Sequence, residues 1–491
     1  MGDFEFSIKH AGKVLPIKLP AGSTGADLRK AVEELVQIPA DRQKYMVKGG
    51  LGDETAVADV VKPGSSVLLL GTPDKDMVVK PRTAEKFIED LGADAQSGQL
   101  SRVPMGIVNM GNTCYMNATL QGLYGIVPLR EQILAFDDKK ATAEGMDLYH
   151  VQLIREIQAT FRKLRDKKGE AITPMLLLEI LRRVFPQFSE MDRQGGFYKQ
   201  QDAEELFTQL FHTMQTVFGE ELIDRFKIGF KTTIKDTMNE GDVTEKTEDD
   251  LKLRCHITGA TNFMKAGIKE SLKETIEKRS DVTGASSTYS VEKKITKLPE
   301  YLTVQYVRFF WKKSTGKKSK ILRKVQFPFQ LDVADLLTPE YAQTKIQVRE
   351  AFREVDKERA ESIRERKRSK FNPAPAEGGS TPAEAAEIAR SLEESTREKW
   401  ARAFAAKTPA DLGRGENPSC VYDLIGVITH QGANSESGHY QAFMRDEFDD
   451  DKWYKFNDDK VTAIEKEKIE SLAGGGESDS ALILIYKGFG L

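Results

Sequence analysis

The sequence predicts an α+β protein with two globular domains joined by a polar linker. Three observations predict this architecture. Strand and helix patterns alternate over residues 1–73, a polar and charged segment follows over 74–101, and the region 102–491 combines helical periodicity near its start with alternating strand patterns near its end. With 491 residues and 39% hydrophobic content, the chain is long enough to build more than one core.

The first domain is predicted to contain four short strands around one helix. Phe4–His10 and Val14–Leu19 have the apolar pattern of strands and are separated by a turn at Ala11-Gly12. Two further apolar runs, Tyr45–Val47 and Val67–Leu70, supply the other strands. This order of elements resembles ubiquitin, which implies a β-grasp fold. Because the domain does not end in Leu-Arg-Gly-Gly, the resemblance implies a docking domain and not a transferable modifier.

The helix of this domain is predicted from a start signal and from helical spacing. Thr24 and Asp27 form a capping-box pattern, in which side chains satisfy the first backbone N–H groups of a helix. The spacing of one helix face is then kept by four apolar residues, Leu28, Ala31, Val32 and Leu35. This spacing predicts a helix that begins near Thr24.

Two segments between or within the domains have a distinct composition. The linker is predicted to contain one short helix near Ala84–Leu91. A charged helical insertion is predicted in the second domain at about 344–417. Within it, Val348–Ala360 is amphipathic, Asn372–Pro382 is rich in Pro and Gly, and Ala383–Lys407 is again helical. We expect a helical hairpin joined by a flexible loop.

The charge balance argues against whole classes of partner. Lys and Arg number 73 against 76 Asp and Glu, so no global field attracts nucleic acid or an anionic membrane. For the basic run Arg364–Lys370 the solvated end of a charged helix is favoured over a nucleic-acid or localisation patch. No apolar run approaches the roughly 18 residues of a membrane span. Because the first residues also lack a signal-peptide pattern, we expect a cytoplasmic and nuclear protein.

The cysteines are few and widely spaced. Only Cys114, Cys255 and Cys420 are present, which fits a reducing compartment better than a disulfide framework. There is no Cys-x-x-Cys, and Cys255 with the adjacent His256 offers two ligands where structural zinc takes four. We therefore expect no metal and no cofactor, and a free thiol at Cys114.

Around Cys114 the sequence predicts a nucleophile at the start of a helix. Asn112 or Thr113 is a suitable N-cap, and a buried stripe follows at Met116, Leu120 and Leu123. The N-terminal end of the helix dipole favours a thiolate, which is the reactive form of cysteine. On the preceding loop, Asn109 can donate its amide to a developing oxyanion, with an ordinary turn asparagine as the alternative.

Strands near the C-terminus are predicted to bring a base to this thiol. Tyr422–His430 and His439–Arg445 alternate like strands, and Trp453–Phe456 forms a third. Antiparallel neighbours bring the start of one strand beside the end of the next. Asn457, which ends the third strand, can therefore orient the imidazole of His439.

Four segments that follow one another along the chain form a combined pattern, which is far more specific than any one of its residues. They are Gly111-Asn-Thr-Cys-Tyr-Met-Asn117, Gln200-Gln-Asp-Ala-Glu-Glu205, Gly438-His-Tyr440 and Trp453-Tyr-Lys-Phe-Asn-Asp458. The pattern resembles the ubiquitin-specific protease family from about Val103 to Leu491, including the apolar segment Leu298–Phe310. The resemblance implies a papain-like domain with a helical thumb, a palm and β-rich fingers. Within the family it points to proteasome-associated members with an N-terminal ubiquitin-like domain.

The resemblance implies a thiol-dependent deubiquitinase that hydrolyses the bond after the C-terminal glycine of ubiquitin. Its catalytic groups would be Cys114 as nucleophile, His439 as general base, Asn457 as the residue that orients it, Asp458 as an assistant and Asn109 as the oxyanion donor. Gln201 and Asp202 would hold the ubiquitin tail. Tyr440 would form part of the cleft wall, with simple strand packing as the alternative.

The resemblance also implies partners and regulation. The partners would be ubiquitin, ubiquitinated proteins and, through the ubiquitin-like domain, the regulatory particle of the proteasome. Two loops would cover the tail cleft until docking moves them, and the corresponding segments here are Leu331–Gln343 and Gly432–Ser437. Because the first contains apolar Val333, Leu336 and Leu337, a short packed helix is its alternative.

The chain departs from the family pattern at two points, and two other functions stay open. It lacks the zinc-binding cysteines of many relatives, and Glu204 stands where the family usually has histidine. The first rival function is a ubiquitin-binding adaptor without activity. The presence of Cys114, His439, Asn457 and Asn109 together argues against it, because an inactive scaffold has no physical need for all four. The second is a papain-like peptidase for general peptides, against which the ubiquitin-like N-terminus and the Trp453 strand argue.

Overall fold

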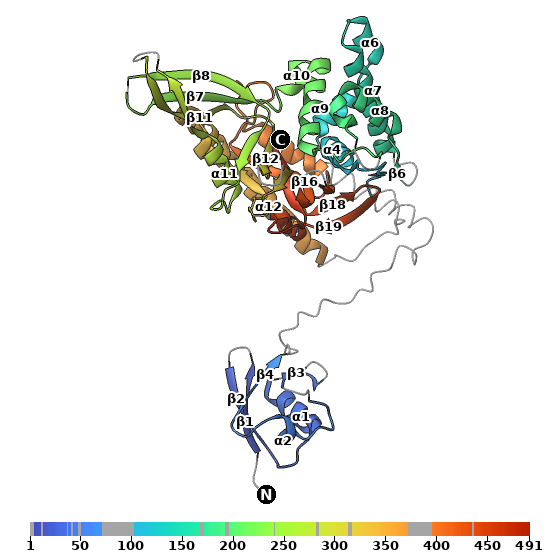
Figure 1. Cartoon of the computed structure of the whole chain (residues 1–491), viewed down its shortest axis with the longest axis vertical. Coiled ribbons are helices and arrows are strands. Elements are labelled where there is room, and N and C mark those ends of the chain that lie inside the picture. The colour runs from blue at the N-terminus through green and yellow to red at the C-terminus, as the bar shows by residue number, and fades with distance from the viewer. Residues whose placement is uncertain are drawn as a thin grey trace. The chain divides into compact units, whose positions relative to one another are not determined.

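The computed structural model divides into two compact units, Met1–Ser97 and Gly98–Leu491 (Figure 1). The structure describes residues 4–10, 13–36, 38–40, 43–47, 51–70, 103–166, 171–191, 196–239, 241–280, 284–312, 317–371, 395–434 and 437–491. The predicted linker with its helix at Ala84–Leu91 and the predicted loop at Asn372–Pro382 lie outside these ranges. Among the described helices, none is long and apolar enough to cross a membrane.

The first unit is a four-stranded sheet with one main helix. Its elements are β1 (Phe4–His10), β2 (Lys13–Leu19), α1 (Gly25–Val36), β3 (Lys44–Met46), α2 (Val57–Val60) and β4 (Ser66–Leu70). The strand order is β2-β1-β4-β3, with β1 and β4 parallel and the other pairs antiparallel. The strands and α1 lie where the sequence predicts them.

Helix α1 begins as predicted. The Asp27 carboxylate accepts a hydrogen bond from the Thr24 backbone N–H at 2.9 Å and lies 3.1 Å from the Thr24 hydroxyl. Leu28 and Val32 are buried against the sheet. Leu35 lies in the helix as predicted, and 54% of this residue is exposed. In the last turn Val36 packs against the core in its place.

The second unit begins with a group of helices that forms one end of the domain (Figure 1). They are α4 (Cys114–Tyr124), α5 (Val127–Leu134), α6 (Asp138–Ala143), α7 (Leu148–Asp166), α8 (Met175–Val184), α9 (Ala203–Phe218) and α10 (Glu220–Ile223). The short strands β5 (Gly106–Ile107) and β6 (Ala171–Ile172) pair in parallel beside them. Apolar side chains of α4, α7, α8 and α9 share one core with one face of the main sheet.

That main sheet is eight-stranded and carries the C-terminal half of the predicted site. Its strands are β9 (Leu253–His256), β12 (Tyr301–Val307), β15 (Gln330–Asp332), β16 (Val421–Asn434), β17 (Ser437–Arg445), β18 (Lys452–Asn457), β19 (Lys460–Glu465) and β20 (Ser480–Gly488). Neighbouring residues of β20 face opposite cores, with Ile485 on the helical side and Leu484 on the other. The sheet is therefore buried on both faces, which holds β17 and β18 rigidly beneath α4.

A second, four-stranded sheet projects from the domain at the side away from the helices (Figure 1). Its order is β10-β11-β7-β8, built from β7 (Ile228–Asp236), β8 (Val243–Asp250), β10 (Lys273–Arg279) and β11 (Ser286–Lys297). Helix α11 (Met264–Ser271) lies between β9 and β10 in the chain. The hairpin of β13 (Phe309–Lys312) and β14 (Lys317–Lys320) extends beyond β12.

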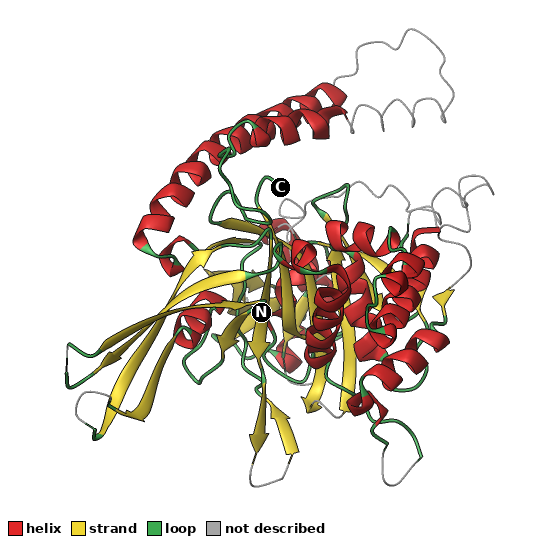
Figure 2. Cartoon of the chain, turned by 90° about the horizontal axis from the view of Figure 1, so that it is seen from above, coloured by secondary structure: helices red, strands yellow, loops and turns green. Residues whose placement is uncertain are grey.

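The helical insertion is longer at its start than the sequence predicts. Helix α12 spans Pro339–Phe371 and projects beyond the sheets as the longest helix in Figure 2. The second predicted helix is described over 395–405, and residues 383–394 lie outside the described ranges. Phe352 of α12 and Phe404 pack edge to face at 5.1 Å, and both contact Phe489. These aromatic contacts attach the insertion to the C-terminal end of the sheet.

Both segments expected to be cleft-covering loops are more regular than a loop. Leu331–Gln343 comprises the end of β15, a 3₁₀ turn at Ala334–Leu336 and the start of α12. Its apolar residues Val333, Leu336 and Leu337 are buried, so the packed-helix alternative is right. Most of Gly432–Ser437 belongs to the ends of β16 and β17, where Asn434 pairs with Ser437.

Candidate active site

The thiol of Cys114 lies at the first residue of α4, where the helix dipole is positive. Thr113 takes the N-cap position, as predicted, but its side chain makes no capping bond. Its hydroxyl instead accepts a hydrogen bond from the Met110 N–H at 2.9 Å and lies 3.3 Å from Asn109 Oδ1. Asn112 has a φ of 54°, the left-handed conformation that lets the loop turn directly into the helix.

The helix end does not by itself produce a thiolate. Burial raises the pKa of Cys114 to about 11; the backbone N–H of Tyr440 opposes this rise and the charge of Asp458 adds to it. The residue is 2% exposed, so the cost of desolvating an anion exceeds the stabilisation from the helix end. A base must therefore take the thiol proton as the reaction proceeds.

His439, the predicted base, is positioned by the pairing of β17 with β18. Ala442 pairs with Phe456 in antiparallel register, which brings the start of β17 to the end of β18. His439 Nε2 lies 2.6 Å from Asn457 Oδ1. Because an amide oxygen only accepts hydrogen bonds, Nε2 is the donor in this contact, and Nδ1 is the ring nitrogen left for proton transfer. The imidazole can thus accept a proton at Nδ1 while Asn457 fixes its orientation.

Asp458 joins the base to the loop before the nucleophile. Its Oδ2 lies 3.9 Å from His439 Nε2 and accepts a hydrogen bond from Asn109 Nδ2 at 3.0 Å. Its Oδ1 accepts from Asn117 Nδ2 at 2.8 Å, and its carbonyl accepts from the Ile107 N–H at 2.9 Å. These bonds hold Asp458 at a φ of 54°, which is uncommon for a residue with a side chain.

The oxyanion role of Asn109 stays a prediction. Its Oδ1 accepts from the N–H groups of Gly111 at 3.0 Å and Thr113 at 3.2 Å, which is the pattern of an asparagine-stabilised turn. The bond from its Nδ2 to Asp458 goes beyond that turn. Because an amide nitrogen carries two hydrogens and Asn109 is exposed, a second N–H can face a substrate.

Asn117 is a site residue to which sequence reasoning gave no role. It is 2% exposed, and its Nδ2 lies 3.1 Å from the Ile107 carbonyl and 3.3 Å from the Val108 carbonyl, in addition to the bond to Asp458. Three acceptors around one amide nitrogen lock β5, α4 and the β18–β19 turn together. The available signal was a polar residue among apolar neighbours, one turn after Cys114.

The residues predicted to hold a substrate tail lie at the start of α9. Asp202 is its N-cap, with a carboxylate that accepts from the Glu204 N–H at 2.9 Å. Gln201 precedes it and is partly exposed, with Nε2 3.4 Å from the Lys199 carbonyl. Glu204, at the position where the family usually has histidine, forms an ion pair with Lys252.

Tyr440 is buried and does not face an open cleft. It is 1% exposed, and its ring packs edge to face on that of His430 at 4.7 Å. Its hydroxyl has no hydrogen-bond partner among the described residues. This burial favours the alternative interpretation, in which the Tyr440 side chain only packs within the sheet. The backbone N–H of Tyr440 nevertheless faces the Cys114 thiol.

Two buried titratable groups beside the site were not predicted. Lys320, at the end of β14, is 5% exposed and donates to the His430 carbonyl at 2.5 Å. The Phe309 ring packs on His430 at 5.4 Å. Burial lowers the pKa of Lys320 to about 8, and burial with the nearby Lys320 charge lowers the pKa of His430 to about 3. These contacts attach the β13–β14 hairpin to the strand next to His439.

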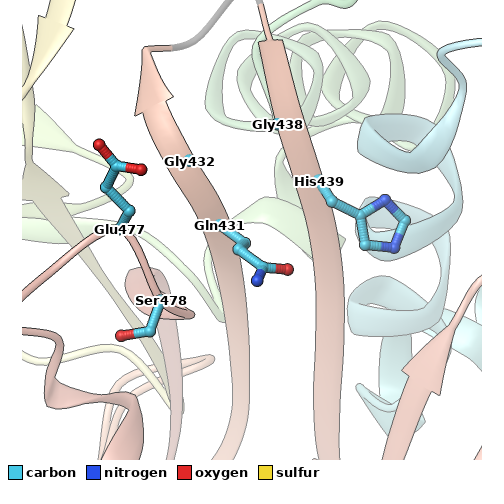
Figure 3. A pocket seen from close by; sticks show the side chains of 6 residues that line it. All are labelled: Gln431, Gly432, Gly438, His439, Glu477 and Ser478. Atoms are coloured by element: carbon cyan, nitrogen blue, oxygen red, sulfur yellow. The ribbon is translucent and has the colours of Figure 1, made fainter.

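An open hollow of about 450 Å³ also borders His439. In Figure 3, Gln431 and Gly432 of β16 lie between the loop that carries Glu477 and Ser478 and the strand that carries Gly438 and His439. Its lining is polar, and its volume is within the range of ligand sites. Among the described residues no group of three or more His, Cys, Asp or Glu is arranged to hold a metal ion.

Comparisons with known proteins match nearly the whole chain. A family model described as ubiquitin carboxyl-terminal hydrolase matches residues 105–486. Ubiquitin carboxyl-terminal hydrolase 6 of Schizosaccharomyces pombe is 38% identical, covering 98% of each chain. The Arabidopsis thaliana protein named ubiquitin carboxyl-terminal hydrolase 6 is 34% identical over 98% of each chain. Ubiquitin carboxyl-terminal hydrolase 14 of Caenorhabditis elegans is 30% identical over 92% of this chain and 87% of its own length.

Proposed function

The chain belongs to the ubiquitin carboxyl-terminal hydrolase family and is a cysteine-type deubiquitinase, and we propose that it hydrolyses the bond after the C-terminal glycine of ubiquitin with Cys114, His439 and Asn457. The proposed catalytic roles rest mainly on the 2.6 Å contact between His439 Nε2 and Asn457 Oδ1. This contact fixes the imidazole beside the strand residue whose N–H faces the thiol. A buried thiol, an oriented imidazole and an amide orienter form the set required for acyl transfer.

In the first step, His439 Nδ1 takes the proton from Cys114 as the sulfur attacks the glycine carbonyl carbon. The carbonyl oxygen becomes an oxyanion, which Asn109 stabilises with an amide hydrogen bond. When the tetrahedral intermediate collapses, the bond between carbon and the lysine nitrogen breaks, and His439 gives its proton to that nitrogen. The products are a free lysine amine and a thioester between Cys114 and ubiquitin.

In the second step, water attacks the thioester with His439 again as base. Ubiquitin leaves with a free carboxylate, and the proton returns to the Cys114 sulfur. Asn457 keeps the imidazole in one tautomer through both steps, while Asp458 ties the base to the Asn109 loop. Gln201 and Asp202, at the exposed start of α9, hold the ubiquitin tail.

The test is covalent labelling by ubiquitin that carries a C-terminal electrophile. We expect a mass gain of one ubiquitin on the wild type, located at Cys114, and none on Cys114→Ala. The matched control is Cys420→Ala, which removes another buried thiol and leaves labelling intact. Labelled Cys114→Ala protein would contradict the assignment of the nucleophile.

We further propose that the second unit has a papain-like arrangement. Helices α4 to α10 form a thumb, the eight-stranded sheet a palm, and the projecting sheet of β10, β11, β7 and β8 the fingers that hold the body of ubiquitin. The domain would extend over 102–491 with the insertion at about 344–417. The described sheets and the family match over 105–486 support this division.

The N-terminal unit is proposed to be a ubiquitin-like domain that docks on the regulatory particle of the proteasome. Support comes from a row of cross-strand neighbours on the sheet, in which Val14 pairs with Lys9, Lys9 with Leu68, and Leu68 with Met46. Val14, Leu68 and Met46 are 59%, 43% and 64% exposed. An exposed apolar row on a sheet face is a docking surface for a protein partner.

The docking proposal is tested by changing this row. Leu68→Asp combined with Met46→Asp should abolish binding to purified proteasomes. Leu35→Asp, which alters an apolar residue of similar exposure on α1, is the matched control and should bind normally. Equal binding by both variants would contradict docking through the sheet face.

Docking is proposed to activate the enzyme, in the cytoplasm and the nucleus. Labelling that rises when proteasomes are added would support activation by the partner through a population shift. Strong labelling without them would indicate a constitutive enzyme.

No labelling in either condition would favour the alternative, a ubiquitin-binding proteasome adaptor with little activity. Cleavage of unfolded peptides but not of ubiquitin conjugates would favour a general papain-like peptidase.

A further inference from the structure

We propose that Lys252 and Glu204 are positioning residues for ubiquitin binding, because their ion pair fixes Asp202 relative to the projecting sheet. The inference rests on the proposed function, in which Asp202 holds the ubiquitin tail, and adds two residues to that substrate site. Both residues act through Asp202 and not on the reacting atoms.

Glu204 reaches Asp202 through its backbone. Asp202 is the N-cap of α9, and its carboxylate accepts a hydrogen bond from the Glu204 N–H at 2.9 Å. In the same turn the Asp202 carbonyl accepts from the Leu206 N–H at 3.1 Å. The direction of the Asp202 carboxylate is therefore set by the first turn of α9, and a shift of that turn moves it.

The side chain of Glu204 is held from outside the helix. Its carboxylate forms an ion pair with the Lys252 ammonium. The Thr208 hydroxyl accepts from this ammonium at 3.0 Å and donates to the Glu204 carboxylate, also at 3.0 Å. Because Glu204 and Thr208 are four positions apart, they share one face of α9, and Lys252 binds both. The Lys252 and Glu204 side chains are 15% and 22% exposed, so water screens the pair only in part.

Lys252 lies at the junction of the two sheets. Strand β8 ends at Asp250 in the projecting sheet, and β9 begins at Leu253 in the eight-stranded sheet. Leu251 packs against the core that contains α9, whereas Leu253 belongs to the core on the other face of the eight-stranded sheet. The short connection is thus anchored on both sides of Lys252, which makes it a fixed point for the start of α9.

The charges around this junction direct the ammonium to α9. A hollow of about 150 Å³ borders Lys252, and Glu248 and Asp250 are among the acidic residues of its lining. Both already have basic partners, since Asp250 pairs with Arg254 at 2.9 Å and Glu248 pairs with Lys293. Lys252 therefore does not need to neutralise either of them.

The position of Asp202 matters because ubiquitin is proposed to bind at two places. The projecting sheet holds its folded body, and the start of α9 holds its tail. The spacing between these places must match a rigid ligand, and a site that is already ordered binds more tightly than one that must be ordered. The ion pair sets this spacing. It should act on ubiquitin binding and leave the thiol unchanged, since Cys114 begins a different helix.

The test measures KM and kcat for a fluorogenic ubiquitin substrate. The full chain is assayed under the condition, alone or with proteasomes, in which electrophile labelling is faster. Lys252→Met keeps most of the side-chain length and removes its charge. We expect KM to rise about fivefold while kcat stays within about twofold, which is the pattern of lost binding. Lys252→Arg keeps the charge and should keep KM within about twofold of the wild type.

Two further measurements separate positioning from a general structural role. Asp202→Ser keeps an N-cap but lacks the carboxylate, so in this background Lys252→Met should raise KM by less than about twofold. Alkylation of Cys114 by iodoacetamide should proceed at the same rate in the wild type and in Lys252→Met. The matched control is Arg183→Met, which removes an ion pair with Glu179 inside α8 and should keep the wild-type KM.

Glu204→Gln is a second variant that keeps the test decisive if Lys252→Met does not fold. Its amide oxygen still accepts a hydrogen bond from the ammonium, so KM should rise by only about threefold. An unchanged KM in a folded Lys252→Met protein would overturn the proposal. A fall in kcat at constant KM, or an equal rise of KM in the Asp202→Ser background, would overturn it as well. Failure of the proposed function would look different, because the wild type would cleave no ubiquitin substrate and Cys114 would not be labelled.

Discussion

At the residue scale, the reactivity of Cys114 is set by its surroundings more than by its position at a helix start. The helix dipole favours a thiolate, but burial raises the pKa of the thiol to about 11. A raised pKa keeps the proton on sulfur below that value, so the thiolate fraction grows only as the pH rises. The resting enzyme therefore holds a neutral thiol at physiological pH.

This state predicts the pH dependence of alkylation. With iodoacetamide and no substrate, modification of Cys114 should be slow at pH 7 and increase about tenfold per pH unit toward pH 11. Peptide mass spectrometry at several pH values measures the rate. A rate that is already at its plateau near pH 6 would mean a preformed ion pair with His439 and contradict this prediction.

Asn117 should matter for both stability and catalysis. Asn117→Ala removes an amide that bonds two carbonyls and the Asp458 carboxylate, and we expect a stability loss of about 2 kcal/mol. Because Asp458 then no longer holds Asn109 firmly, kcat should fall by about tenfold or more with little change in KM. Thermal unfolding and steady-state cleavage of a fluorogenic ubiquitin substrate measure the two effects.

Asn117→Asp is the diagnostic companion to that variant. It keeps the shape but places a carboxylate against three acceptors, so it should be the more damaging change at pH 7. Lowering the pH protonates a carboxyl group in this pair, which should restore part of the lost activity relative to wild type. If Asn117→Asp behaved like the wild type at pH 7, the network could not be holding the site together.

At the scale of single elements, the β16–β17 hairpin shows how backbone geometry positions His439, the proposed base. Gly438 precedes His439 and has a φ of 118°, which favours glycine. A Cβ there would lie 2.1 Å from the Gln431 carbonyl oxygen and 2.8 Å from His430 Nε2. The hairpin therefore closes tightly only because this position has no side chain.

We expect Gly438→Ala to push the two strands apart and move His439. Activity with a fluorogenic ubiquitin substrate should fall by more than tenfold, because small displacements of a catalytic base are costly. Gly145→Ala is the control, since Gly145 also has a positive φ of 75° but nothing lies within 4 Å of its added Cβ. An equal loss in both variants would assign the effect to backbone strain and not to the hairpin contact.

At the scale of the whole molecule, the two units have separate buried cores. The core of Met1–Ser97 includes Leu28 and Val32, and that of Gly98–Leu491 is built from other residues. Each unit buries its own apolar surface and should fold without the other. The proposed catalytic residues all belong to the second unit.

A truncated chain of residues 98–491 tests this independence. It should unfold cooperatively and be labelled by electrophilic ubiquitin at the basal rate of the full chain. Any acceleration by proteasomes should disappear, because the proposed docking surface is absent. Calorimetry and timed labelling measure these outcomes. A truncated chain that aggregates would contradict independent folding, and one that keeps the acceleration would contradict docking through the first unit.

Much of the fold and the order of the site follow from local patterns in the sequence. The strands around Tyr422–His430 and His439–Arg445 and the helix at Cys114 lie where periodicity predicts them. The contact of His439 with Asn457 follows from antiparallel neighbours. Local signals were weaker at the ends of elements, so α12 begins at Pro339, before the expected boundary, and Leu331–Gln343 is packed rather than a loop.

The sequence by itself determined which chemical groups are present, their order in the chain and the secondary structure around them, because these depend on neighbours a few residues apart. Only the tertiary structure decided the neutral state of Cys114, the burial of Tyr440, the network around Asn117 and the hollow beside His439. Each depends on groups far apart in the chain, such as Asn109 and Asp458, which are 349 positions apart. Desolvation and hydrogen bonding act through space, so these properties arise only when the chain has folded.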